Sequence, residues 1–552
     1  MTDLLSLSNA PIQTITADSQ GMVPSFYGPN GATLVYLDFG GGRVAMTPIN
    51  LATDFAAHVN ASDPHGSKAT AVAEINAQKG AVNGIAPLGA DGKVPTSLIP
   101  PLGAQNTASI PALLAQNPFY IAHRGSGMEY PEHTMAAYEA ALTGGVQAIE
   151  VSAGITADGI PVCIHDSTLD RTTTGTGPLS NVPYATLINT VQVNVSSILG
   201  QGWKPQPFAT LRDVFDRFFG RVVIFLEPKS NEAVPVIQKF LQDYYPNANQ
   251  YVVWKNYFSN PSFALMKSRG FTTWGYVDAG TTDAQMAAVD SNIDIWGVPA
   301  NMTDARKAEV VAKGKPVICW EVHRRSQRDK LVGLGVRGMM AAQYKWLTTN
   351  YQILKHDNWV SCVKAPGDMG RIYYDGTRDM KYDGDGWVHF DVLSEAAMIG
   401  SCSIPSFPAN GYRMTFDMKY DGAVPSQEHA GVAFGKPDDS PYRFSQVNDS
   451  GGYHMLLRGS GSLELYSHAP GVTSGTQLAI AASTPPVAGQ VMSFQVDVTP
   501  TQVKITRTDV TPNVTVSSTN TTYRGGYVHI SGGSISNLAN KPRWRNLTVN
   551  AL

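Results

Sequence analysis

Two histidines, an arginine and a glutamate lie close together within residues 120–177, each beside or inside a short apolar run. His123 and Arg124 follow the first run. Glu150 lies in the second run, and His165 follows the third. A histidine pair can supply the general base and the general acid that cleave a phosphodiester, and the arginine fork binds phosphate oxygens. These residue types therefore predict phosphodiester chemistry.

A second segment, VVIFLEPK at residues 222–229, adds another carboxylate and an ammonium group. Glu150 and Glu227 offer the hard oxygen ligands that Mg²⁺ and Ca²⁺ prefer, and such an ion would spread the charge of a transferring phosphoryl group. Lys229 is suited to bind a phosphate oxygen. We therefore expect the two segments to share one site.

Short strands and a hairpin must position these side chains. The apolar run Phe119–Ala122 and the segment Ala148–Val151 read as strands, with a helix between them. A turn at Asp158-Gly159 predicts a hairpin. In a regular hairpin Ser152 lies roughly opposite His165, which brings the histidine beside the carboxylates.

Strand and helix signals then alternate as far as residue 342. Together with the strands that end at His123, Glu150 and Glu227, this alternation predicts eight barrel strands, with the arm before His165 as an antiparallel extra. The further strands are expected at Tyr251–Trp254, Thr272–Val277, Ile295–Val298, Pro316–Val322 and Gly338–Ala342. The helices are expected at Glu232–Tyr244, Ser262–Arg269, Asp283–Asp290, Thr303–Lys313 and Gln327–Leu334. In a (β/α)8 barrel the chemistry lies at the carboxyl ends of the strands.

Residues 118–350 resemble the glycerophosphodiester phosphodiesterase family. The motifs that carry the resemblance are His123-Arg124-Gly125, Pro131-Glu132-His133-Thr134, Glu150-Val151-Ser152, Thr156-x-Asp158-Gly159, His165-Asp166, Arg171-Thr172-Thr173, Glu227-Pro228-Lys229 and Trp320-Glu321-Val322-His323. The resemblance implies that the substrate's own vicinal hydroxyl attacks phosphorus and gives a cyclic phosphate.

The resemblance also implies a role for each matching residue. His123 and His165 become the acid/base pair, and Glu150 and Glu227 become ligands of a divalent cation, Mg²⁺ or Ca²⁺. Arg124 and Lys229 become phosphate contacts, and Trp320 is left open as a substrate-binding aromatic on the inner wall or a residue of the core. Asp166 is left open as an orienting group for His165, a metal ligand or a solvated turn residue, and Arg171 is expected to structure its loop.

Several residues depart from the family pattern. Ser152 stands where the family has an aspartate, and a neutral hydroxyl is a poor ligand for a divalent cation. Glu132, Asp166 or water are the alternatives for that position. Glu321 and His323 replace a threonine and an asparagine and are expected at the barrel rim. Two interpretations follow: an active phosphodiesterase, or a catalytically inactive barrel that serves as a binding module.

The composition limits the class of protein. The chain has 552 residues, enough for two to four domains, and a net charge of −3, which gives no bulk attraction to nucleic acid. Its 52 glycines and 35 prolines indicate many turns. The four cysteines lack metal-site spacing and are expected as buried thiols. We expect neither a signal peptide nor a membrane span.

The first 117 residues are expected to form an attachment segment and a neck. Residues 1–55 are expected as a β-rich attachment segment, with short β segments in residues 1–45 that are clearest at Thr33–Phe39. Residues 56–117 are expected as a neck and linker, with short helices at Asn50–Val59 and Ala69–Ala77 before a Pro/Gly connector. About residues 55–103 resemble the neck regions of tailed-phage tail fibres and minor tail proteins. The resemblance implies a trimer, because such necks commonly trimerise. A solvated Pro-rich linker is the alternative.

Residues 356–552 change to a period of two and predict a β-sandwich, most simply a jelly roll. The rhythm of its strands looks like that of concanavalin-like or laminin-G sandwiches. Sugar binding by exposed aromatics such as Trp387 or Tyr466 and a folding or trimer-capping role are both left open. The barrel itself is expected to span residues 118–355.

The whole sequence thus predicts a multidomain, homotrimeric phage tail protein with a phosphodiesterase barrel. Its expected partners are other tail proteins and a host cell-envelope phosphodiester, such as a teichoic acid or lipid headgroup, or a glycan, and no nucleic acid. The expected location is the virion, at the tail tip or fibre, with action at the host cell surface. A secreted bacterial phosphodiesterase is the third interpretation, which the neck and the lack of a signal peptide disfavour.

Overall fold

The computed structural model divides the chain into two compact units, Met1–Ala104 and Gln105–Leu552. In the first unit four short strands are described. In the second unit the structure describes residues 109–348, 357–364, 380–393, 398–403 and 407–552.

The four strands of the first unit form two antiparallel pairs. Strand β1 (Leu5–Ser6) pairs with β2 (Phe26–Tyr27), and β3 (Val35–Asp38) pairs with β4 (Arg43–Met46). The strand expected at Thr33–Phe39 is confirmed by β3. The expected short helices and the Pro/Gly connector lie outside the described residues.

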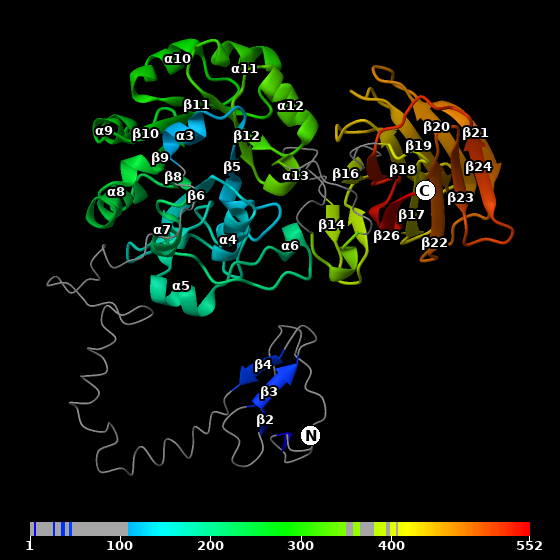
Figure 1. Cartoon of the computed structure of the whole chain (residues 1–552), viewed down its shortest axis with the longest axis horizontal. Coiled ribbons are helices and arrows are strands. Elements are labelled where there is room, and N and C mark those ends of the chain that lie inside the picture. Colours follow the sequence, from blue (N-terminus) through cyan, green and yellow to red (C-terminus); the bar gives the residue numbers. More distant parts are fainter. Residues whose placement is uncertain are drawn as a thin grey trace. The chain divides into compact units, whose positions relative to one another are not determined.

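Eight parallel strands close into a barrel in the second unit (Figure 1). The barrel is closed because β5 pairs with both β6 and β13. The strands are β5 (Phe119–Ala122), β6 (Ala148–Ile155), β8 (Val223–Pro228), β9 (Val252–Tyr257), β10 (Thr272–Tyr276), β11 (Ile295–Pro299), β12 (Val317–Val322) and β13 (Gly338–Ala341). The barrel expected from the alternation of strands and helices is therefore confirmed.

Helices surround the barrel on its outside (Figure 1). They are α4 (Met135–Thr143), α7 (Leu211–Phe218), α8 (Ala233–Tyr244), α9 (Ser262–Ser268), α10 (Asp283–Ala287), α11 (Asp304–Val311), α12 (Arg325–Gly333) and α13 (Tyr344–Thr348). The short helix α3 (Ile110–Leu114) instead packs Ile110 and Leu113 on the cluster inside the barrel. Helix α7 shows why these segments are helical. Thr210 and Asp213 form a capping box at its first turn, and its apolar face is buried.

Two hydrophobic clusters fix the strands. The cluster inside the barrel includes Phe225, Trp274, Ile318 and Met340, all fully buried. The second and larger cluster packs the outer faces of the strands against the helices. The interior of the barrel is therefore a packed core and not an open channel, and side chains that point inward near the carboxyl ends of the strands lie above it.

A hairpin and a small subdomain follow β6. Strand β7 (Pro161–Cys163) runs antiparallel to β6, as expected, and α5 (Tyr184–Thr190) and α6 (Ser196–Leu199) cover a separate apolar cluster. The expected register was wrong by one residue. The turn is centred on Asp158, with Thr156 bonded to Ile160, so the backbone of Ser152 bonds Ile164 rather than lying opposite His165.

Two antiparallel sheets make up the carboxy-terminal region and share one hydrophobic cluster. The first sheet contains β14 (Met380–Tyr382), β15 (Val388–Phe390), β17 (Tyr412–Tyr420), β22 (Met492–Val498), β23 (Val503–Arg507), β24 (Val514–Ser518) and β26 (Pro542–Ala551). The second contains β16 (Met398–Ser403), β18 (His429–Lys436), β19 (Gly452–Arg458), β20 (Ser462–His468), β21 (Thr476–Ala482) and β25 (Tyr527–Ser531). Alternating burial along β17 matches the period of two in its sequence.

The aromatic residues suggested as sugar contacts are not freely exposed. Trp387 is 4% exposed, and the cationic groups of Lys419 and Arg545 lie over its ring. Tyr466 stacks on His454. Trp387 was therefore wrongly expected at the surface.

One buried carboxylate joins the barrel to the sheets. Asp439, in the connection between β18 and β19, accepts hydrogen bonds from the backbone N–H groups of Arg325 and Ser326 and from the indole N–H of Trp346. The first two donors open α12 and the third lies in α13. Asp439 therefore satisfies three donors of the barrel that would otherwise be buried without an acceptor.

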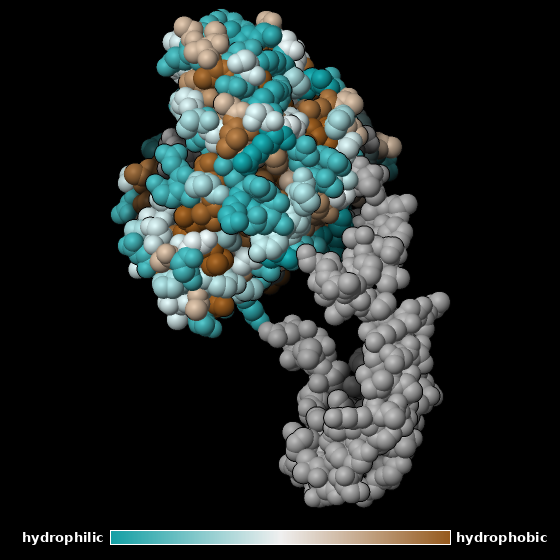
Figure 2. Space-filling model, turned by 90° about the vertical axis from the view of Figure 1, so that its left-hand side faces the viewer, coloured by the Kyte–Doolittle hydropathy of each residue, from teal (hydrophilic) through white to brown (hydrophobic). Residues whose placement is uncertain are grey.

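The outer face of the barrel toward α8 and α9 carries only small, separated apolar patches among hydrophilic residues (Figure 2). Within the described residues, no helix is both long enough and apolar enough to span a bilayer. Cys163 and Cys319 are buried free thiols, as expected, whereas Cys362 is partly exposed.

Candidate active site

A tight turn places His123 and Arg124 at the carboxyl end of β5. Three successive residues, Arg124, Gly125 and Ser126, have left-handed φ angles of 55°, 75° and 73°. A side chain at Gly125 would meet Ala137 at 2.9 Å, so the turn needs glycine there. The turn directs the backbone N–H of Arg124 toward Glu150 Oε2, at 3.0 Å.

The two predicted metal ligands lie on neighbouring strands. Ser152 of β6 is in register with Glu227 of β8. Its hydroxyl donates to Glu150 Oε1 at 2.8 Å and lies 3.5 Å from Glu227 Oε2. All three side chains are buried. The structure therefore brings the three predicted ligands together, with the serine acting as a donor between the carboxylates.

A lysine that the sequence analysis did not single out lies between these carboxylates. Lys255, on β9, places its Nζ 2.8 Å from Glu150 Oε1 and 2.7 Å from Glu227 Oε2. Its side chain is buried, and the ammonium lies over the rings of Trp274 and Tyr276 at 5.3 and 5.7 Å. Tyr276 also donates its hydroxyl to Glu227, at 2.7 Å.

His165 is held on both of its ring nitrogens. Nδ1 lies 2.7 Å from Asp166 Oδ1, and Nε2 lies 3.3 Å from the Nζ of Lys229. Because Asp166 only accepts and an ammonium only donates, the ring proton belongs on Nδ1 and Nε2 is the free base. Lys229 also donates to Glu227, at 3.2 Å.

Arginine–carboxylate pairs connect the two histidine turns. Glu132 is buried and binds Arg124 at 3.1 Å and Arg171 at 2.7 Å. Arg171 also binds Asp166, which orients His165. With the contacts of the lysines and Glu150, these bonds form a closed circuit around the mouth of the barrel.

His123 has its own carboxylate partner at the end of β12. Its Nδ1 lies 3.4 Å from Glu321 Oε1, and Glu321 Oε2 lies 3.0 Å from His323 Nε2. The expectation that Glu321 and His323 sit at the rim is thus only partly met, since Glu321 reaches inward to His123. Nothing in the motif pattern signalled this contact, because it joins the first and seventh barrel strands.

The environment fixes the charge of these groups. Burial lowers the pKa of His123 to about 3, against the opposing effect of Glu321, and burial also lowers the pKa of His165. Burial alone would protonate Glu150 and Glu227. The ammonium of Lys255 instead holds the pKa of Glu150 well below its usual range, and with Lys229 it lowers the pKa of Glu227 to about 2.

The remaining predicted substrate residues lie in the same region. Trp320, on β12, is partly buried and meets Tyr276 edge to face, with ring centroids 5.8 Å apart. It therefore packs on the interior cluster of the barrel. Arg124 directs its guanidinium at Glu132, so its predicted contact with phosphate requires that this pair be shared with the substrate.

The side chains around Glu150 and Glu227 do not fit the coordination of a divalent cation. Every oxygen of Glu150 and Glu227 already accepts from a protein donor, and the position between them faces an ammonium group. The two carboxylates considered as substitutes at Ser152 are engaged elsewhere, Glu132 with two arginines and Asp166 with His165. Across the described residues, no cluster of three His, Cys, Asp or Glu side chains offers a metal site.

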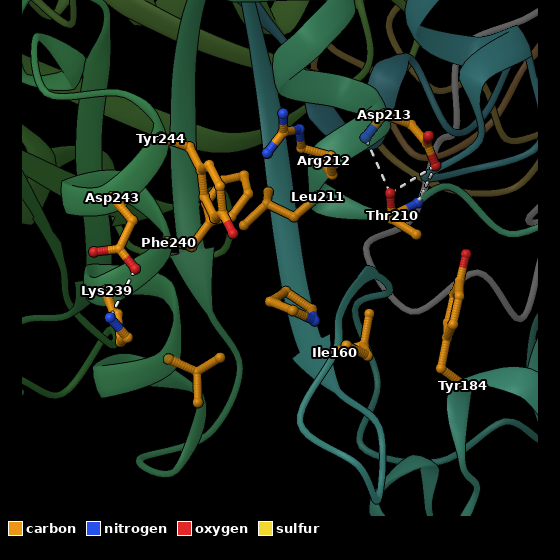
Figure 3. A pocket seen from close by; sticks show the side chains of 12 residues that line it. Ile160, Tyr184, Thr210, Leu211, Arg212, Asp213, Lys239, Phe240, Asp243 and Tyr244 are labelled. Atoms are coloured by element: carbon orange, nitrogen blue, oxygen red, sulfur yellow. Dashed lines mark hydrogen bonds and ion pairs between the residues drawn. The ribbon is translucent and has the colours of Figure 1, made fainter. Parts of the chain in front are cut away.

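A hollow on the outer wall of the barrel, between β7, α7 and α8, is separate from this site (Figure 3). Its charged residues form ordinary local pairs: Lys239 binds Asp243 at 2.7 Å, and Asp213 caps α7 through Thr210. None of the residues discussed at the barrel mouth lines it. The chemistry therefore belongs to the mouth.

Comparison with known proteins agrees with this placement. Residues 123–341 match the model of the glycerophosphoryl diester phosphodiesterase family. The probable glycerophosphodiester phosphodiesterase 1 of Mycobacterium tuberculosis is 48% identical over 75 residues, which cover 14% of this chain and 27% of that protein. Glycerophosphodiester phosphodiesterase 1 of Homo sapiens is 32% identical over 136 residues, covering 24% and 41%. The chain thus spans less than half the length of these relatives.

Solved structures of phosphodiesterases are also similar to the barrel. A phosphodiesterase of Oleispira antarctica in complex with the product sn-glycerol-3-phosphate is 22% identical, covers 41% of this chain and 93% of its own, and has a TM-score of 0.37. The glycerophosphodiester phosphodiesterase of Thermotoga maritima is 17% identical, covers 41% and 95%, and has a TM-score of 0.34. The barrel strands and the site residues described above lie within or directly beside residues 123–341, the range that matches the glycerophosphoryl diester phosphodiesterase family model.

Proposed function

We propose that the barrel is a phosphodiesterase that cleaves glycerophosphodiester bonds with His123 and His165 as its acid/base pair. One observation carries the proposal. At the same end of the barrel each histidine faces a carboxylate through Nδ1, Glu321 for His123 and Asp166 for His165. This arrangement orients each imidazole through Nδ1, and Nε2 of His165 becomes available to a substrate when Lys229 moves from it to the phosphate.

The proposed reaction has two steps, formation of a cyclic phosphate and its hydrolysis. One histidine removes the proton of the glycerol hydroxyl next to the phosphate, and that oxygen attacks phosphorus. The other histidine protonates the leaving alcohol oxygen as its bond to phosphorus breaks, which gives a cyclic phosphate. Water then opens the ring while the two histidines exchange roles, and both return to their starting states. No step is assigned to a metal.

Substrate binding favours uptake of the missing proton from solvent. Both histidines are neutral in the free protein because burial lowers the pKa of each. A phosphodiester anion beside an imidazole favours the imidazolium, so it raises the pKa of the histidine that acts as the acid. Lys229 lies 3.3 Å from His165 and can bind the same anion.

The setting proposed for this activity is a phage tail. Residues 55–103 resemble tail-fibre necks, which supports a homotrimeric minor tail or receptor-binding protein in the virion that contacts other tail proteins through its first 55 residues. The substrate would then be a host-envelope phosphodiester, of the teichoic-acid or lipid-headgroup type. The two carboxy-terminal sheets would form a lectin-like jelly roll that contacts a glycan or caps the trimer.

A specific observation also favours a second function. Ser152 replaces the family aspartate, and the circuit of ion pairs at the mouth is complete without a ligand. A barrel of this kind can bind an envelope phosphodiester without cleaving it.

Turnover of the full-length protein distinguishes the two functions. Glycerophosphocholine and poly-glycerophosphate are incubated with the protein, with and without Mg²⁺ or Ca²⁺, and glycerol phosphate release is measured. Release that is lost in His123→Ala and kept in His389→Ala, which alters a histidine of the carboxy-terminal sheets, supports the enzyme. The absence of release under every condition, with no gain from Ser152→Asp, supports the binding module.

A further inference from the structure

We propose that the ammonium of Lys255 permanently takes the position of a divalent cation between Glu150 and Glu227, so that this domain works without metal. The inference rests on the proposed function for its catalytic part only. Its structural part, that Mg²⁺-like ions do not bind at these carboxylates, stands independently of activity.

The position of Lys255 follows from the order of the strands. β6, β8 and β9 are neighbours in the barrel and carry Glu150, Glu227 and Lys255 respectively. Nζ lies 2.8 Å from one glutamate and 2.7 Å from the other. A single group thus bridges both carboxylates, which is the role that a bound cation would otherwise have.

Each oxygen atom of the two carboxylates already accepts at least one hydrogen bond from the protein. Glu150 accepts from Lys255 and Ser152 on Oε1 and from the backbone of Arg124 on Oε2. Glu227 accepts from Lys229 and Tyr276 on Oε1 and from Lys255 on Oε2. A metal ion would have to displace at least one charged donor.

The local charge also disfavours a metal. Glu150 and Glu227 contribute two negative charges, Lys255 and Lys229 contribute two positive charges, and Ser152 is neutral. A divalent cation would therefore approach a group with no net charge. Expelling the ammonium of Lys255, which is buried, would leave it without its two carboxylate partners.

Lys255 is in this view a positioning residue. It binds Glu227, which in turn holds Lys229 beside His165. It also binds Glu150, which accepts from the backbone of Arg124, next to His123. The positive charge that meets the phosphate then comes from Lys229 and the arginines.

Binding of Mn²⁺ alone, followed by electron paramagnetic resonance, tests the structural part. The wild-type protein is expected to bind no Mn²⁺ at this site up to about 1 mM, the weak end of protein sites for hard divalent cations. Lys255→Met keeps the length of the side chain and removes the charge, and it is expected to gain one Mn²⁺ site that the double variant with Glu227→Gln lacks. Lys255→Arg keeps the charge and is expected to gain none.

Turnover tests the catalytic part. Glycerophosphocholine cleavage by the wild type is expected to be unchanged by a chelator, whereas any turnover of Lys255→Met should require added Mn²⁺. The inference is overturned if the wild type binds one Mn²⁺ that Glu227→Gln abolishes, or if a chelator stops its turnover. If Lys255→Met does not fold, the wild-type and Lys255→Arg measurements decide alone. If the wild type has no turnover at all, the proposed function fails while the Mn²⁺ result still decides the site.

Discussion

Nδ1 of His123 lies 3.4 Å from Oε1 of Glu321, a contact between the first and seventh strands of the barrel. A carboxylate in this place holds the proton on Nδ1 and stabilises the imidazolium that forms when Nε2 accepts a proton. In the proposed mechanism Glu321 therefore orients one half of the acid/base pair.

Glu321→Gln is expected to lower kcat about 10- to 100-fold, the range seen when a partner that orients a functional histidine is lost. The amide keeps the shape of the side chain but not its charge, so KM should change little. Steady-state kinetics on glycerophosphocholine measure both constants. Glu309→Gln, on the exposed face of α11, is the matched control and should behave as wild type. An unchanged kcat in Glu321→Gln would contradict the orienting role.

Arg171→Met is expected to weaken the other half of the pair. Arg171 bridges Glu132 and Asp166, and Asp166 holds His165. Without the bridge Asp166 is free to rotate, and we expect a loss of about tenfold or more in kcat/KM, the cost of misplacing a catalytic group. Arg212→Met removes an exposed pair on α7 and serves as the control. Equal kinetics in both variants would show that the bridge only structures its loop.

His133 makes stability depend on pH. Burial lowers its pKa to about 3, so the unfolded chain, with a histidine pKa near 6.5, binds a proton that the folded protein does not. The contribution of His133 to the free energy of unfolding is therefore fully present above pH 6.5. It falls as the pH drops toward 3, by up to about 1.4 kcal/mol per pH unit. Urea unfolding of wild type and His133→Asn between about pH 5 and 7 measures it. The variant should show a smaller slope, and an identical slope would refute the assignment.

Asp439→Ala is expected to destabilise the protein by about 2–4 kcal/mol, because it leaves two backbone N–H groups and the Trp346 indole without an acceptor. Urea unfolding followed by tryptophan fluorescence reports the change, since Trp346 itself is fully buried. Asp243→Ala, which removes an exposed pair with Lys239, should shift the transition by less than about 0.5 kcal/mol. Similar shifts in the two variants would mean that the three donors find water instead.

The barrel could be predicted from sequence because its signals are local. Each strand is a short apolar run, and several helices begin at a side-chain cap, as α7 does at Thr210. The hairpin register could not be fixed to the residue, because a turn centred on Asp158 and one centred on Asp158-Gly159 have almost the same sequence signature.

The motif residues of the site could be predicted for the same reason, but their partners could not. Lys255 lies in a strand that reads as an ordinary apolar run, and only the neighbouring strands reveal that it faces two glutamates. Glu321 reaches His123 across about 200 residues of sequence, and closure of the barrel brings them together. Contacts of this kind depend on topology, which no local pattern encodes.

The three hydrogen bonds that Asp439 accepts also determine where the chain can be cut. A fragment that ends with the matched family domain at residue 341 would lack α13 and the acceptor that completes α12. α12 begins four residues after Glu321, the partner of His123, so trimming would disturb the segment that holds the catalytic imidazole. Expression of this domain by its sequence boundaries should accordingly yield a damaged enzyme, and the unit to clone runs through the last strand of the chain.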